Sequence, residues 1–170
     1  MNKKSIFLPS MVAAYAGAVL ITVPGLKNFG CCLIVPATVA GAMYFYKRLN
    51  PGFNSFTLKD ALKFSLLTGS LVAITRSLID IVLSFIFRSN DFTVTLPEME
   101  KVLREMALGN TVEEAIKLLR VMASDIENSG FSFLYSFFSI AGNLILDIIF
   151  AIPGGLFARN ILNKRQDLGI

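Results

Sequence analysis

The chain has 170 residues, of which 54% are hydrophobic and 16% are charged, and its mean hydropathy is +0.64. Soluble domains carry about 25% charged residues, and sixteen Lys/Arg, twelve Asp/Glu and no His cannot easily cover a soluble surface. These figures argue against an extended soluble enzyme, a disordered tail and a nucleic-acid-binding module. They favour a small integral membrane protein.

The hydrophobic residues fall into four long stretches, at about residues 6–26, 29–46, 61–87 and 131–158. Each is near or above the ~20 residues that a helix needs to cross the bilayer core. A lone strand cannot satisfy its backbone polar groups in lipid, so each stretch is expected to be a helix. The sequence therefore predicts an all-α, integral membrane four-helix bundle that forms a single membrane domain over 1–170.

The first stretch follows a basic start, Asn2-Lys3-Lys4, which also occurs in signal peptides. Its apolar run is longer than a signal peptide usually has, which favours a retained helix. The second stretch opens with Cys31 and Cys32. Adjacent cysteines suit neither a normal disulfide nor paired metal ligands, so they are interpreted as small packing residues.

Polar residues interrupt the third and fourth stretches. Arg76 and Asp80 are four residues apart, so they lie on one helix face and can pair. If the two helices run in opposite directions, Arg76 falls near the depth of Asn143 and Asp147. An intramembrane polar cluster of these four residues is thus predicted. It is interpreted as a structural ion pair that fixes helix register, with a proton or ion path as the alternative.

Residues 95–128, between the third and fourth stretches, have the pattern of two amphipathic helices. Thr95-Leu96-Pro97-Glu98 has capping-box spacing, and Gly109 is a natural stop. The second helix is expected to start at Thr111 and to end before Asn128. Its predicted apolar face comprises Val112, Ala115, Leu119, Met122 and Ile126. The pair is expected to close the bundle or lie at the interface; a cap over a substrate path or a docking surface is the alternative.

The basic residues near helix ends set the orientation. One side would hold Lys3, Lys4, Lys47, Arg48, Lys59, Lys63, Arg159, Lys164 and Arg165, and the other only Lys27 and Arg88. Both termini are therefore placed in the cytoplasm, with the amphipathic pair outside. The loop from 88 to 130 has five basic and eight acidic residues, a net charge of −3, and the rest of the chain carries +7.

Small residues recur four apart at Ala13/Gly17, Ala37/Gly41 and Ser65/Gly69/Ala73, and they are expected to let helices pack closely within the bundle, with a dimer face as the alternative. Pro153-Gly154-Gly155 is expected to loosen the last turns of the fourth helix.

The absence of His excludes catalytic triads that contain His and metal sites that are ligated by His. No phosphate-binding glycine loop is found, so neither an enzyme nor a cofactor is expected, and the acidic residues of the outer loop are placed on solvated faces.

Several segments carry a family resemblance: Gly30-Cys31-Cys32-Leu33, Tyr44-Phe45-Tyr46-Lys47-Arg48, Ser55-Phe56 through Ala61, and the Pro153-Gly154-Gly155-Leu156 tail. In layout the chain resembles small bacterial four-helix integral membrane proteins of unknown function. The resemblance implies a multi-pass protein of the bacterial inner membrane and transfers no functional residue.

Two functional hypotheses follow. The first is a structural or accessory membrane component that contacts a partner protein. The alternative is a small oligomeric ion or solute transporter that uses Arg76, Asp80 and Asp147. The expected partners are the lipid bilayer and either a membrane protein or a second copy of the chain, with no nucleic acid.

Overall fold

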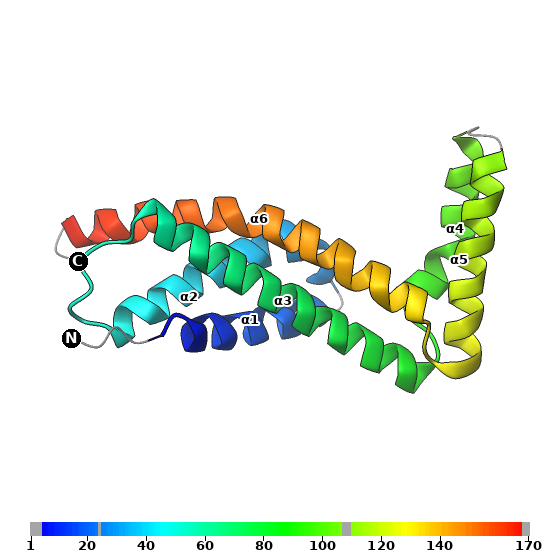
Figure 1. The fold of residues 1–170 in the computed structure, drawn as a ribbon, viewed down its shortest axis with the longest axis horizontal. Helices are drawn as coiled ribbons and strands as arrows, with labels where there is room; N and C mark the ends of the chain where they lie inside the picture. Colours follow the sequence, from blue (N-terminus) through cyan, green and yellow to red (C-terminus); the bar gives the residue numbers. More distant parts are fainter. Residues whose placement is uncertain (1–4, 24, 107–109, 168–170) are drawn as a thin grey trace. The chain divides into compact units, whose positions relative to one another are not determined.

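The computed structural model describes residues 5–23, 25–106 and 110–167, and it is all-α: those residues form helices and no strand. The elements are α1 (Phe7–Thr22), η1 (Lys27–Phe29), η2 (Gly30–Ile34), α2 (Val35–Leu49), α3 (Leu58–Phe87), α4 (Asp91–Glu105), α5 (Asn110–Ser129) and α6 (Phe133–Asp167) (Figure 1). The predicted fold class is confirmed at this level.

Three helical segments among the described residues are long and apolar enough to cross a membrane: Lys27–Leu49, Leu58–Phe87 and Phe133–Lys164. They support a membrane protein. The first predicted span, 6–26, is too long, because α1 has 16 residues and ends at Thr22. Val23 is extended, with φ −72° and ψ 126°, as expected for a residue that precedes proline in the sequence. At 1.5 Å per residue α1 is about 24 Å long.

The chain forms two compact units, Met1–Arg76 with Ile140–Ile170, and Ser77–Ser139. The helices α3 and α6 contribute residues to both. In the first unit α1 and α2 run side by side, and a Cβ built on Gly17 of α1 would overlap the side chain of Thr38 in α2. The small-residue positions Ala13, Gly17, Ser65, Gly69 and Ala73 are buried, as predicted, whereas Ala37 is exposed and Gly41 half-exposed.

The segment Pro153-Gly154-Gly155 does not loosen α6, contrary to the prediction, because the helix continues without a break to Asp167. Its glycines instead allow close packing. A Cβ on Gly154 would lie 2.5 Å from the Cα of Pro36 in α2, and one on Gly155 would overlap the Ser65 hydroxyl of α3. Because Gly154 and Gly155 have no side chains, α6 can pack closely against both α2 and α3.

An aromatic cluster joins the end of α2 to the start of α3. Tyr46, Phe53, Phe56 and Phe64 have ring centroids 4.7–6.3 Å apart. The side chain of Asn163 in α6 accepts from the Phe56 N–H at 2.9 Å and donates to the Phe56 carbonyl at 3.0 Å. These contacts fix the connection between α2 and α3 against α6, and they bring the end of α2, the start of α3 and the end of α6 together.

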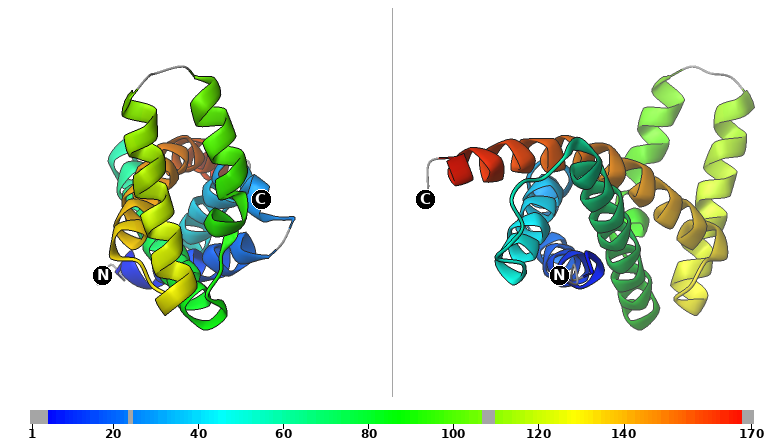
Figure 2. Two further views of the ribbon diagram at one scale, coloured as in Figure 1. Left: turned by 90° about the vertical axis from the view of Figure 1, so that its right-hand side faces the viewer. Right: turned by 60° about the vertical axis from the view of Figure 1, so that its left-hand side comes forward.

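In the second unit α4 and α5 run antiparallel and side by side (Figures 1 and 2). The predicted capping box at Thr95 is wrong: the N-cap of α4 lies five residues earlier, at Asn90, which forms a reciprocal capping box with Thr93. The Thr95 hydroxyl instead donates to the Asp91 carbonyl at 2.7 Å, and Pro97 lies inside the helix. The expected stop at Gly109 lies outside the described residues.

The predicted α5 face is confirmed in part. Val112, Met122 and Ile126 are buried, Ala115 and Leu119 are half-buried, and Ile116 and Ala123 join the buried face. The helix extends past its predicted end to Ser129 and stops at Gly130, which has φ +79°. A Cβ on Gly130 would lie 2.7 Å from the Phe85 carbonyl oxygen, so this turn needs glycine for both its conformation and its contact with α3.

Candidate functional site

An ion pair joins α3 to α6 within the first unit. Nη1 of Arg76 lies 3.3 Å from Oδ1 of Asp147, and the Asp147 side chain is fully buried while that of Arg76 is 14% exposed. The two helices approach closely here, since a Cβ on Gly69 would lie 2.8 Å from that of Ala151 and 3.3 Å from the Asp147 carbonyl oxygen. The structure therefore brings together two of the four residues of the predicted polar cluster.

Asn143, the third predicted residue, is buried in α6 one turn before Asp147. The fourth, Asp80, is half-buried in α3 one turn beyond Arg76, and its carbonyl accepts from the Ser84 hydroxyl at 2.8 Å. Asp80 belongs to the second unit, whereas the ion pair lies in the first. Its place in one cluster with Asp147 stays a prediction.

Cys31 is a neighbour of the ion pair that the sequence interpretation missed. Its Sγ lies 4.0 Å from Oδ1 of Asp147, within reach of a weak S–H···O hydrogen bond. Cys31 belongs to η2, a π-helical turn at the start of the second helical segment, whereas Cys32 beside it is exposed. Interpreting both cysteines as packing residues was therefore incomplete for Cys31.

The ion pair is only partly satisfied. Within the described residues, Nε of Arg76 and Oδ2 of Asp147 are buried and have no hydrogen-bond partner. A buried charge is costly, and its counter-charge offsets that cost only partly when other polar atoms are left unbonded. The structure thus shows a buried contact between α3 and α6, and its role as a structural ion pair stays a prediction.

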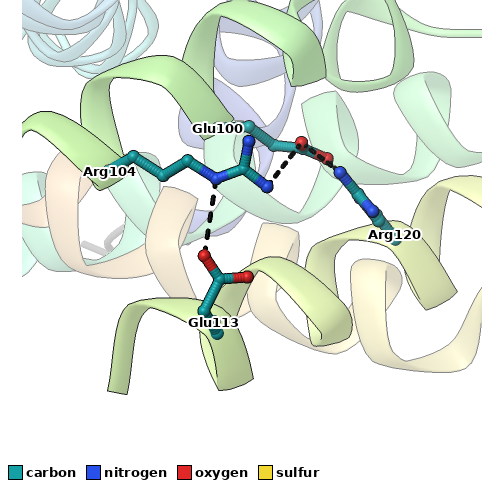
Figure 3. Close-up of polar contacts among 4 residues, drawn as sticks. All are labelled: Glu100, Arg104, Glu113 and Arg120. Atoms are coloured by element: carbon teal, nitrogen blue, oxygen red, sulfur yellow. Dashed lines mark hydrogen bonds and ion pairs between the residues drawn. The ribbon is translucent and has the colours of Figure 1, made fainter. Parts of the chain in front are cut away.

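A second polar network joins α4 to α5 (Figure 3). Arg120 of α5 donates from Nε to Oε1 of Glu100 at 2.7 Å and from Nη2 to Oε2 at 2.6 Å. Arg104 lies between two carboxylates, with Nη2 4.0 Å from Glu100 and Nε 3.5 Å from Glu113. The placement of all outer acidic residues on solvated faces is therefore wrong for Glu100, which has a side chain only 14% exposed.

The network shifts the protonation of its members. The hydrogen bonds from Arg120 lower the pKa of Glu100 below its ordinary value of 4.5. The same hydrogen bonds raise the pKa of Arg120. Bidentate Arg–carboxylate pairs are geometrically specific, so this contact fixes the register between the two helices.

An apolar stripe lies on another face of α4. Met99, Val102 and Met106 follow each other at helical spacing and are 38%, 51% and 57% exposed. A surface depression of about 360 Å³ is lined by Met99 and Val102 together with Thr95, Glu98 and Leu103. Although α4 is strongly amphipathic in sequence, it has no fully buried residue. The stripe thus stays exposed within the second unit.

Comparisons with protein-family models, with curated proteins and with solved structures find no match for this chain. The resemblance to small bacterial four-helix membrane proteins stays a prediction that rests on the residues named above.

Proposed function

We propose that this protein is an accessory component of the membrane, which docks a basic amphipathic segment of a partner membrane protein onto α4. One observation carries the proposal: Met99, Val102 and Met106 form an exposed apolar stripe on a helix that buries no residue of its own. An amphipathic helix normally buries its apolar stripe against a partner element.

The stripe is separate from the contact with α5. At 3.6 residues per turn, the centre of Met99, Val102 and Met106 lies about 150° around α4 from the centre of Glu100 and Arg104. Because Glu100 pairs with Arg120 of α5, the stripe is directed well away from that helix. A partner helix can therefore occupy the stripe while the α4–α5 pair remains intact.

Charge selects the partner. Glu98 and Glu105 are exposed and flank the stripe seven residues apart, and the segment 88–130 carries a net charge of −3. Opposite charges across an interface increase the association rate and disfavour wrong partners. A helix with its own apolar stripe and flanking Lys or Arg side chains fits this surface.

The proposed membrane placement follows the charge pattern. In the first unit Lys47, Arg48, Lys59, Lys63 and Lys164 lie where α2 and α6 end and α3 begins, and Lys27 lies between α1 and η2. The positive-inside rule then puts the first group in the cytoplasm, with both termini. We propose that α1 is the fourth span of a four-helix bundle in a bacterial inner membrane, with α4 and α5 outside.

Purification with native associates tests the accessory role. The intact protein should copurify stoichiometrically with one membrane protein in mild detergent. Val102→Asp/Met106→Asp should remove that protein, because the substitution puts charge on the stripe. The matched control is Leu118→Asp/Val121→Asp, which changes two exposed apolar residues of α5 and should retain it. Recovery of the lone chain, or equal loss with both variants, would contradict the proposal.

The fully buried charge of Asp147 supports transport as a second candidate, since ionisable residues inside membranes often mark ion or proton paths. Reconstitution of the purified protein in vesicles separates the two functions. Ion or proton flux that depends on Asp147 would support a transporter. If the protein is folded in the vesicles and no ion or proton flux is measured, the result would favour a structural role for the ion pair.

A further inference from the structure

An apolar groove of about 470 Å³ runs between α2 and α6 on the first unit. Small residues line it, among them Ala37 and Gly41 of α2 and Ala158 of α6, and the exposed rings of Tyr44 and Phe157 line it too. The groove explains why Ala37 and Gly41 do not pack inside the unit as predicted. Both helical segments that form it are apolar and long enough to cross a membrane.

The dimensions of the groove match one leaflet. Its lining extends from Cys32 in η2 to Tyr44 on α2 and from Gly154 to Leu162 on α6. At 1.5 Å per residue these two stretches are about 18 Å and 12 Å long, against roughly 15 Å for half of the hydrocarbon core. An extended acyl chain therefore has room along most of its length.

Cations lie at one end of the groove. Arg48 follows Tyr44 by one helical turn, Lys164 follows Ile161 by nearly one turn, and both side chains are exposed. At the same end, Nζ of Lys47 in α2 donates to the carbonyl of Leu162 in α6, another lining residue, at 2.9 Å. The apolar groove thus ends in a basic edge.

We infer that the groove binds one anionic phospholipid, with an acyl chain along α2 and α6 and its phosphate at Arg48 and Lys164. Charge complementarity selects this occupant over a second copy of the chain. A two-fold contact through Ala37 and Gly41 would bring the basic edges of two copies together, and like charges repel. The inference concerns the first unit and is independent of partner docking on α4.

Native mass spectrometry of the detergent-solubilised full chain tests the inference, with phosphatidylglycerol and phosphatidylcholine added in equal amounts. The phosphatidylglycerol adduct should dominate. Arg48→Gln/Lys164→Gln should reduce its excess roughly fivefold for each cation removed. The control Lys59→Gln/Lys63→Gln removes the same number of exposed cations from the start of α3, which does not line the groove, and should reduce the excess much less.

Filling the groove gives a second readout. A Cβ on Gly41 meets nothing within 4 Å, so Gly41→Leu should fold and occupy the space of the acyl chain. It should abolish the adduct. Gly142→Leu is the matched control, because Gly142 of α6 is equally open and does not line the groove. Equal retention of both lipids, an adduct that survives Gly41→Leu, or a dimer that Gly41→Leu converts to monomer would overturn the inference.

Discussion

Arg76 of α3 and Asp147 of α6 form an ion pair at 3.3 Å, with the carboxylate wholly removed from the protein surface. The two residues are 71 positions apart in the sequence. Their contact therefore links two long apolar helices that are distant in the sequence.

Arg76→Leu should lower the free energy of unfolding by about 3 kcal/mol, because it leaves the buried Asp147 carboxylate without its counter-charge. The double variant Arg76→Leu/Asp147→Leu should recover most of that loss, since it removes both charges. Unfolding by denaturing detergent, followed by circular dichroism, measures both. A double variant as unstable as the single one would contradict a structural role for the ion pair.

Gly155→Ala should destabilise the first unit by about 1–3 kcal/mol, because the added Cβ overlaps the Ser65 hydroxyl and lies 3.0 Å from the Ala61 carbonyl oxygen. Gly142→Ala is the control in the same helix. Its Cβ meets nothing within 4 Å, so it should be neutral or should stabilise by up to about 1 kcal/mol. Thermal unfolding in detergent compares them; equal effects would mean that α6 does not pack closely at Gly155.

Asn163→Ala should lower the free energy of unfolding by about 1–3 kcal/mol, because the Phe56 N–H loses its bond to the Asn163 amide and the Phe56 carbonyl keeps only its bond from Nε of Arg159. Proteolysis between residues 50 and 57 should become faster, since this connection is held to α6 by the same amide. Asn128→Ala, at an exposed position of α5, serves as the control. Unchanged cleavage in Asn163→Ala would show that the aromatic cluster and the Arg159 bond to the Phe56 carbonyl hold the connection without Asn163.

Acid should weaken the contact between α4 and α5. The folded pKa of Glu100 lies below its ordinary value of 4.5, so its pairing with Arg120 stabilises the fold fully above that value. The stabilisation is lost as the pH falls through the lowered folded pKa. Glu100→Gln should remove this acid-dependent part of the stability, and Glu114→Gln, an exposed α5 carboxylate, should not. Unfolding measured between pH 7 and pH 3 checks the difference.

The helices were predictable from hydropathy because membrane-spanning segments must be long, apolar and helical. Their ends depend on local competition. Pro24 follows Val23 in the sequence and carried a usable signal for the early end of α1. At α4, two capping patterns compete, and the Asn90–Thr93 box begins the helix although Thr95-x-x-Glu98 matches the common motif better.

Contacts between helices were less predictable. Helix depth placed Arg76 near Asp147 in the predicted cluster, whereas the direct pairing predicted from the sequence was that of Arg76 with Asp80. Cys31, which contacts Asp147, lies in a π-helical turn, and hydrophobic periodicity does not predict such a turn. The Glu100–Arg120 pair depends on the register between α4 and α5, which hydrophobic periodicity does not determine.

Photo-crosslinking from Val102 tests the proposed docking on α4 most directly. A benzoylphenylalanine at Val102 in native membranes should yield one recurrent protein adduct, crosslinked through a Lys- or Arg-rich amphipathic segment. The same probe at Glu114 on α5 should not yield it, and Glu98→Lys/Glu105→Lys should suppress it. Adducts from Val102 that are only lipid, only a second copy of the chain, or the same as those from Glu114 would contradict the account.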